Sequence, residues 1–154
     1  MGIEIRVADI GDLEDIQRLN NKLFEYEYER FDPLLVRGWP FSEKGKKYFE
    51  SIIEEEIALV AVDDGVIIGY LAGTMDTKNS CYNGTMAELD NFYIDERYRG
   101  NSLGRKMVDE FKKYCKEKGV DTIKVTASAL NSGAIAFYEK NGFIKSEITL
   151  RYTV

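Results

Sequence analysis

Hydrophobic and polar residues follow two different periods along this chain of 154 residues. Six segments are predicted to be strands: 3–7, where apolar and polar residues alternate with a period of two, and 57–62, 66–74, 85–94, 122–127 and 143–154. Other segments repeat their hydrophobic residues every three or four positions, as amphipathic helices do, and these begin after Asp9, after Ser42, at Leu103 and at Ser132. The predicted order is β-α-α-β-β-β-α-β-α-β, with a last strand that can be divided in two.

Start and stop signals support this order. Asp9 and Ser42 are suitable N-caps, because their side-chain oxygens can accept hydrogen bonds from the first free N–H groups of a helix. Gly119 and Gly142 are suitable ends for the third and fourth helices. The residues at 63–65, Asp-Asp-Gly, predict a tight hairpin between two strands. Hairpin-linked strands followed by a β-α-β-α-β half predict an α/β (α+β) fold, in which a mixed sheet carries helices on both faces.

The composition is that of a folded, water-soluble protein. Apolar residues make up 44% of the chain and charged residues 31%, and the length is that of one domain, residues 1–154. No segment contains the run of about 20 apolar residues that crosses a bilayer. The N-terminal residues lack the basic and apolar stretches of a signal peptide, so we expect a cytoplasmic protein with no membrane partner. The net charge of −6 argues against a nucleic acid partner.

Several kinds of catalytic chemistry are excluded by residue type. The chain has no histidine, which removes Ser-His-Asp and Cys-His machinery and every zinc motif that contains histidine. Cys81 and Cys115 are too few and too far apart to indicate a disulfide framework or a metal site. Cys115 falls on the apolar face of a predicted helix, which favours a buried thiol. Cys81 falls in the polar loop 77–84, as a passive or a reactive residue.

A cluster of cations stands out on this acidic chain. Between positions 93 and 104 the sequence reads YIDERYRGNSLG, a strand end followed by a charged turn and a glycine-flanked helix start. The cations in or beside this turn are Arg97, Arg99, Arg105 and Lys106. The start of a helix offers free N–H groups and a partial positive charge, and glycines let the backbone approach a ligand closely. The turn therefore predicts a site for a phosphate-bearing ligand, although a glycine-rich turn without a ligand is the alternative.

Two other phosphate motifs fit this turn poorly. A dinucleotide fingerprint needs Gly-x-Gly-x-x-Gly, whereas Gly100 and Gly104 stand four apart with no glycine between them. A Walker loop needs Gly-Lys-Ser/Thr, whereas Gly104 is followed by Arg105 and Lys106.

Two blocks of the chain resemble the GCN5-related N-acetyltransferases, the GNAT superfamily. The family's Gln/Arg-x-x-Gly-x-Gly/Ala signature corresponds here to RGNSLG at 99–104, with Ser102 where the central glycine is usual. Its Asn-x-x-Ala-x-x-x-Tyr-x-x-x-Gly-Phe segment corresponds to NSGAIAFYEKNGF at 131–143. The resemblance covers nearly the whole chain and is sharpest from 88 to 143. It implies the GNAT fold, with a mixed, mostly antiparallel sheet, and acetyl-CoA as co-substrate, without a metal.

The resemblance also implies how acetyl-CoA is bound. Its diphosphate would be held by the residues that start the third helix: Arg99, Gly100, Asn101, Ser102, Leu103 and Gly104, with Arg105. In the family the strand before this turn bulges and separates from its parallel neighbour, which frees main-chain groups for pantetheine and the thioester carbonyl. Phe92, Tyr93 and Ile94 hold those positions here, with the side chains of Phe92 and Ile94 expected in the core. Asn131 would contact pantetheine, or it is an ordinary helix cap.

The catalytic residues are also implied by the resemblance. Tyr138 matches the family tyrosine that protonates the leaving CoA thiolate, and a phenol stays protonated at neutral pH. Glu88 matches a strand glutamate that some members use as the base, and Asp90 lies two residues on, facing the same side of the strand. Two acids on one strand face can equally be solvated or ion-paired. The position at which other members carry a glutamate on the next strand is Thr126 here, which cannot act as a base.

The leading hypothesis is an N-acetyltransferase that acetylates a primary amine of a small molecule or peptide by direct attack in a ternary complex. The alternative is a non-catalytic acyl-CoA sensor or partner subunit. In the family the acceptor pocket is formed by the segment between the first two helices, together with the last strands. Here that segment carries Glu25, Glu27, Glu29, Asp32 and Trp39, so a cationic acceptor is one reading and a solvated acidic face the other. Family members are often dimers, which leaves a homodimer open, through the segment 26–41 or the last strand.

Overall fold

The computed structural model describes residues 2–76 and 81–154, so part of the predicted polar loop, residues 77–80, lies outside the described residues. The strands are β1 (Glu4–Val7), β2 (Ile57–Asp63), β3 (Val66–Thr74), β4 (Met86–Ile94) and β5 (Thr122–Val125). The helices are α1 (Leu13–Arg30), α2 (Glu43–Glu55), α3 (Leu103–Glu117) and α4 (Ser132–Lys140), with short 3-10 turns η1 (Ile10–Asp12), η2 (Trp39–Phe41) and η3 (Glu96–Tyr98). None of the described helices is long and apolar enough to cross a membrane.

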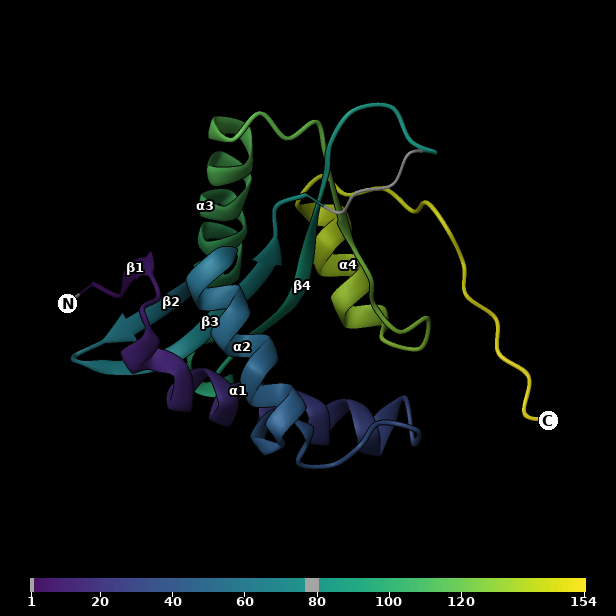
Figure 1. The fold of residues 1–154 in the computed structure, drawn as a ribbon, viewed down its shortest axis with the longest axis horizontal. Coiled ribbons are helices and arrows are strands. Elements are labelled where there is room, and N and C mark those ends of the chain that lie inside the picture. The colour runs from purple at the N-terminus through teal and green to yellow at the C-terminus, as the bar shows by residue number, and fades with distance from the viewer. Residues whose placement is uncertain (1, 77–80) are drawn as a thin grey trace.

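The strands form one sheet in chain order, β1-β2-β3-β4-β5 (Figure 1). Each neighbouring pair from β1 to β4 is antiparallel, and β4 and β5 are parallel. The predicted mixed, mostly antiparallel sheet is therefore confirmed.

Local sequence signals set the starts of several elements as expected. The Asp9 side chain accepts a hydrogen bond from the Gly11 N–H at 2.8 Å and forms a capping box with Asp12, which leads through η1 into α1. Ser42 caps α2 by accepting from the Gly45 N–H at 3.1 Å. At the β2–β3 hairpin both central residues have positive φ, 49° at Asp64 and 78° at Gly65, which is the backbone of a two-residue hairpin turn.

The two faces of the sheet carry two separate hydrophobic cores. On one face α1 and α2 pack with Phe49, Ile16 and Tyr70 among the fully buried side chains. On the other face α3 packs on the strands through Met107, Phe111 and their neighbours, and α4 contributes partly buried aromatic side chains to the same core. Helices on both faces confirm the predicted layers.

Strand β4 changes character in its middle. Its first residues, Met86 to Leu89, pair with β5, and Glu88 and Leu89 pair with β3 as well. At the next residue the pairing with β3 skips a position: Ala72 pairs with Asn91 and Gly73 with Leu89, so Asp90 forms a β-bulge. No residue of β4 beyond Leu89 pairs with β5. The expected bulge and separation of these two strands are therefore both present.

The predicted last strand, 143–154, is wrong for this single chain. Residues 144–154 contain no strand, and they run away from the sheet beyond α4 to the C-terminus (Figure 1). Alternation alone cannot make a strand, because each strand needs a neighbour for its backbone hydrogen bonds. The described residues supply this segment with no such neighbour.

Candidate active site

The turn from β4 into α3 presents a row of free donors. Within the described chain, no N–H group from 100 to 105 donates to a protein acceptor, and the first bonded one is Lys106, whose N–H reaches the Ser102 carbonyl at 3.0 Å. The backbone is left-handed at Gly100, with φ of 86°, and at Ser102, with φ of 72°. Such alternating conformations turn successive N–H groups toward one concave surface, which suits an anion. Ser102 thus adopts a left-handed conformation of the kind that favours glycine.

Gly104 is required by packing and not by an unusual backbone conformation. Its φ is not positive, so unusual backbone freedom is not what this position requires. A Cβ atom there would lie 3.0 Å from Phe137 Cε1 and 3.7 Å from Ile94 Cδ1. Gly104 therefore lets the first turn of α3 approach α4 and β4 closely.

The cations of this turn are only partly free. Arg97 forms an ion pair with Asp95 at 3.3 Å, and Lys22 of α1 reaches the same carboxylate at 3.7 Å. Arg99 folds back, donating from Nε to the Ile94 carbonyl at 2.8 Å with its guanidinium 5.0 Å from the Tyr93 ring centre. In the described part of the chain, Arg105 and Lys106 have no ion pair, so they are the cations most available to a ligand. A concavity of about 410 Å³ borders the turn and is lined by Lys22, Tyr93, Asp95, Glu96 and Arg97.

The second half of β4 has an unpaired side. Phe92, Tyr93 and Ile94 pair with β3 through Leu71, Tyr70 and Gly69, whereas their other edge meets no strand. The Ile94 carbonyl is already held by Arg99, so its backbone is less open to a ligand than expected. The side chains of Phe92 and Ile94 pack in the α3 core, as predicted.

A chain of buried polar groups connects Asp90 to both helices on the opposite face. Tyr48 of α2 donates its hydroxyl to Asp90 Oδ2 at 2.7 Å, and the Thr74 hydroxyl lies 3.1 Å from both carboxylate oxygens. Asn91 donates from Nδ2 to the Tyr48 hydroxyl at 3.0 Å and accepts at Oδ1 from the Tyr70 hydroxyl at 2.6 Å. The bulge therefore turns Asp90 and its successor toward the same face.

The network continues into α1. Asn20 donates from Nδ2 to the Tyr70 hydroxyl at 2.6 Å. The Oδ1 atoms of Asn20 and Asn21 are buried and have no hydrogen-bond partner within the described residues. Buried acceptors of this kind need a donor from water or from a ligand.

The two candidate bases differ in how they are held. Burial raises the pKa of Asp90 above its usual range, while the Tyr48 and Thr74 hydroxyls pull it down. Burial, followed by the negative charge of Asp90, raises the pKa of Glu88. The Glu88 side chain makes no hydrogen bond or ion pair within the described residues, and the residue paired with Glu88 on β5 is Lys124. Thr126 lies just past the end of β5 and is exposed.

Tyr138 lies on α4 and is packed between Phe137 and Phe143, with ring centres 5.2 and 5.5 Å away. Burial raises its pKa, and the negative charge of Glu27 on α1 adds to the shift. Its hydroxyl makes no hydrogen bond within the described residues. Tyr138 therefore keeps its proton at neutral pH, and its hydroxyl is free to donate a hydrogen bond to a ligand.

The acidic residues of the first helix and its following turn separate into different roles. Glu25 pairs with Arg37 at 2.6 Å, Asp32 pairs with Arg151 at 3.1 Å, and Glu29 is exposed. Glu27 alone of this set is partly buried without an ion pair within the described residues. Burial raises its pKa, with a further contribution from the charge of Asp32.

Trp39 is part of the packing over the first two helices. Its ring stacks on Phe24, with centres 5.5 Å apart and planes 6° from parallel, and it also contacts Tyr48 at 5.7 Å. Trp39 thus supports the helix that carries Tyr48 to Asp90.

Asn131 is a helix cap, since its Oδ1 accepts from the Ala134 N–H at 3.1 Å. Its Nδ2 group has no partner within the described residues and can still donate to a ligand.

Cys115 is buried, as predicted, which raises the pKa of its thiol to about 11, and Cys81 is exposed.

Tyr48, Thr74 and Asn91 were not expected as site residues. The helical period after Ser42 places Tyr48 on the apolar face of that helix, which gives no sign of a polar role. The adjacent polar residues Asp90 and Asn91 break the alternation of β4, and this break was the one available sign of a bulge.

A second concavity lies elsewhere on the molecule. It measures about 790 Å³ at the start of α1, lined by residues such as Ile10, Gln17 and Phe41. None of the predicted site residues lines it, so its size does not make it the site.

A mixed sheet that opens beside a helix start with free N–H donors defines an α/β protein with a candidate anion-binding site. Residues 13–143 match the family described as Acetyltransferase (GNAT) family. The chain belongs to this family, and the predicted resemblance is confirmed.

Relatives among known proteins are N-acetyltransferases by name. An uncharacterized N-acetyltransferase of Methanocaldococcus jannaschii is 24% identical over 94% of this chain, which spans 62% of the length of that relative. A spermidine N(1)-acetyltransferase of Thermoplasma acidophilum is 25% identical, with 93% of this chain and 89% of the relative covered.

Solved structures share the fold. A Bacillus halodurans protein, determined as a tetramutant, has a TM-score of 0.86 at 21% identity, covering 98% of this chain and 99% of that one. The aminoglycoside N-acetyltransferase AAC(6')-Iy in complex with CoA has a TM-score of 0.77 at 17% identity, covering 99% and 95%. These similarities confirm the fold class.

Proposed function

We propose that this chain transfers the acetyl group of acetyl-CoA to a primary amine of a small molecule or peptide, while both substrates are bound. The observation that carries the proposal is the row of free N–H groups at 100–105, next to the unpaired half of β4. The family and its relatives support acetyl transfer as the reaction.

The residues present fit the co-substrate. The N–H groups at 100–105 suit its diphosphate, and Arg105 and Lys106 add positive charge. Bound acetyl-CoA supplies a thioester whose carbonyl carbon accepts the amine. The free edge of β4 would hold the pantetheine chain, and Asn131 Nδ2 can donate to it. An N–H on that edge would stabilise the negative charge that develops on the carbonyl oxygen.

Two groups would move the protons. Asp90 is our candidate for the base, because two hydroxyls fix its carboxylate at the bulge and burial brings its pKa closer to neutral. Glu88 is the second candidate. Tyr138 would donate to the departing sulfur, so that a C–N bond forms, the C–S bond breaks, and an amide and a free thiol leave.

Glu27 is our candidate for holding the acceptor. It is the partly buried, unpaired acid on the α1 side, and its charge reaches Tyr138. A cationic amine would offset the cost of leaving this carboxylate half-buried. The acceptors of the named relatives, spermidine and aminoglycosides, are amines of this kind.

The test is release of free thiol from acetyl-CoA in the presence of a panel of polyamines, aminoglycosides and lysine peptides. We expect release with at least one amine, and a much weaker response from Glu27→Gln at the same protein concentration. A protein that binds CoA in calorimetry but releases no thiol with any amine would support the sensor alternative instead.

A further inference from the structure

A continuous run of side-chain hydrogen bonds ends at the Asp90 carboxylate. Its bonds are between 2.6 and 3.0 Å long. Its members in order are Asn20 of α1, Tyr70 of β3, Asn91 of β4, Tyr48 of α2 and Asp90 of β4. In the described structure Asn20 and Tyr70 make no hydrogen bond to Asp90 itself. Any effect of their side-chain hydrogen bonds on the carboxylate must therefore pass through the run.

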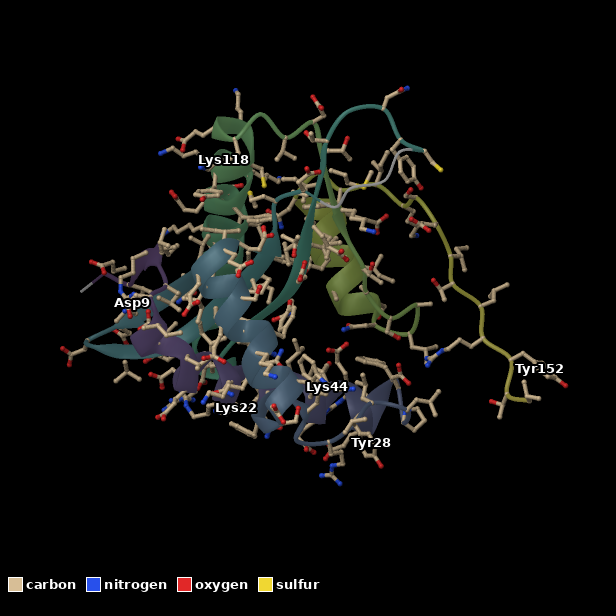
Figure 2. The ribbon with its side chains drawn as sticks, viewed as in Figure 1. Asp9, Lys22, Tyr28, Lys44, Lys118 and Tyr152 are labelled. Carbon is tan, nitrogen blue, oxygen red and sulfur yellow. The ribbon has the colours of Figure 1, made fainter. Side chains whose placement is uncertain are left out.

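The run crosses the layer between the first two helices and the sheet. Tyr48 lies one turn after Lys44 on α2, and Asn20 lies two residues before Lys22 on α1, and Figure 2 labels both lysines. Tyr70, which is fully buried, belongs to the core on this face of the sheet. The surroundings of the Asp90 carboxylate therefore depend on the two helices that cover this face.

All the bonds of the run point in one direction. A phenol hydroxyl has a single hydrogen to donate. The Tyr70 oxygen accepts from Asn20 Nδ2, and its hydrogen goes to Asn91 Oδ1. The Tyr48 oxygen accepts from Asn91 Nδ2, and its hydrogen goes to Asp90 Oδ2. A carboxylate can only accept, so the run ends there.

The amide of Asn91 sets this direction at the centre of the run. Its carbonyl oxygen takes the Tyr70 hydrogen, and its NH2 group occupies the Tyr48 oxygen. The Tyr48 hydrogen is then left for Asp90. Hydrogen bonds in a chain polarise one another, and donation to a carboxylate favours its ionised form. The run therefore stabilises the form of Asp90 that a base must have.

We propose that Tyr70 and Asn91 are positioning residues for Asp90, which direct the Tyr48 hydrogen onto its carboxylate and so keep it ready to accept a proton from the amine. The role in the reaction rests on the proposed function, whereas the effect on the carboxylate does not. Asn20 extends the same run from α1.

Other groups also act on Asp90. Burial is the largest influence on its pKa and raises it, while the two hydroxyls next to the carboxylate lower it. The charge of Glu56, which follows α2, raises this pKa, and the charge of Lys124 on β5 lowers it. The charge of Asp90 in turn raises the pKa of Glu88. Tyr48 stays protonated at neutral pH, because burial raises its pKa. Removing a tyrosine hydroxyl leaves all of these charges in place.

The test is a pH titration of the Asp90 carboxyl carbon by ¹³C NMR, in protein labelled at its aspartates. The signal of Asp90 is identified by its loss in Asp90→Asn. Tyr48→Phe should raise the midpoint by about 1 pH unit, a tenfold change in the dissociation constant of the carboxyl group. Tyr70→Phe should raise it by about 0.3 pH unit, because the bonds of a chain strengthen one another only in part. Asn20→Ala removes the first donor and should act in the same direction.

Tyr98→Phe is the matched control. The Tyr98 hydroxyl donates to Asp63 Oδ2 at 2.7 Å, the same length as the bond from Tyr48 to Asp90, but it lies outside the run. Its loss should leave the titration of Asp90 unchanged. In a Tyr48→Phe background the last bond of the run is absent, so adding Tyr70→Phe should have no further effect. Additive shifts, or no shift with either Tyr70→Phe or Asn20→Ala, would overturn the proposal.

The role in the reaction is read from the pH dependence of kcat. In Tyr70→Phe the rise of kcat should move to higher pH by the same amount as the carboxyl titration, with nearly the wild-type value at high pH. A defect of folding alone would instead lower kcat at every pH. A titration that moves without the rate profile overturns the role in the reaction. If the wild type releases no thiol with any amine, the proposed function fails, and the carboxyl titration still decides whether the run acts on Asp90.

Discussion

The two halves of β4 differ in what they do for the molecule. The first half, Met86 to Leu89, is bonded to β5 along its length and to β3 at Glu88 and Leu89, and Ala87 and Leu89 are almost fully buried. The second half starts at the bulged Asp90, is bonded to β3 alone, and presents Asp90 and Asn91 to a buried polar network. One strand thus supplies the centre of the fold and the edge of the candidate site.

The difference has an energetic meaning. Burying an apolar side chain stabilises the fold, whereas a half-buried carboxylate and an unpaired backbone edge both cost free energy. Such costs are tolerated where a ligand or a reaction uses the exposed groups. We therefore expect substitutions in the first half of β4 to change stability and substitutions in the second half to change activity.

The largest expected effect is on turnover. Asp90→Asn should lower kcat by about 1,000-fold, because the amide cannot accept the proton from the amine. Since the base must be ionised, and burial raises the pKa of Asp90, the wild-type rate should rise with pH through that raised pKa. The variant should lose this dependence. Glu88→Gln is the matched control, and a larger loss in that variant would move the base to Glu88.

The first half of the strand is tested by Leu89→Ala, which should lower the free energy of unfolding by about 3 kcal/mol because the side chain is 1% exposed. Denaturant unfolding measures this loss. Asp90→Asn should instead raise the free energy of unfolding at neutral pH. A raised pKa means that the folded state disfavours the carboxylate, so wild-type stability falls as pH rises through that pKa, and the amide avoids the loss. Equal destabilisation of both variants at neutral pH would remove the distinction between the two halves.

Tyr138→Phe should lower kcat by about 100-fold, with the KM for acetyl-CoA little changed. The phenol hydroxyl has no protein partner within the described residues, so its removal should leave the thermal melt near that of the wild type. A variant that keeps more than half of the wild-type kcat would make Tyr138 a packing residue.

The smallest expected effect comes from the turn before α3. Ser102→Gly should raise stability by about 1 kcal/mol, because Ser102 is left-handed and its side chain makes no cap hydrogen bond. Gly100→Ala is the reverse control at a second left-handed position, where an added Cβ meets no atom within 4 Å, and it should lose a similar amount. The two changes should move the melting temperature in opposite directions, and a shift of the same sign in both would contradict the backbone argument.

Local signals predicted most of the fold. The Asp64-Gly65 turn depends on two residues that tolerate positive φ, and the Asp9 and Ser42 caps depend on side chains next to their own helices. The candidate anion site could also be located in the sequence, because a cationic, glycine-flanked helix start is a local feature. The site residues whose surroundings depend on tertiary packing could not be predicted from the sequence.

Glu27 illustrates that limit. In sequence it stands between Glu25 and Glu29 in an alternating acidic and aromatic stretch, with nothing to distinguish it. Its burial depends on how α1 lies against the rest of the molecule, and the tie from Tyr48 to Asp90 depends on contacts between residues 42 positions apart. Residues 144–154 show the converse case, in which the alternation predicts a strand but the neighbour that a strand needs is absent from the described chain.

The most direct test of the site is an NMR titration of the isotope-labelled protein with CoA, followed through the backbone amides. We predict that the amides of 100–105 shift most, with smaller shifts at Asn131 and in the second half of β4. The amide of Gly119, past the opposite end of α3 from this turn, should stay unchanged as an internal reference. No shift at 100–105 at about 1 mM CoA, the upper end of ordinary substrate affinity, would contradict the placement of the diphosphate at the start of α3.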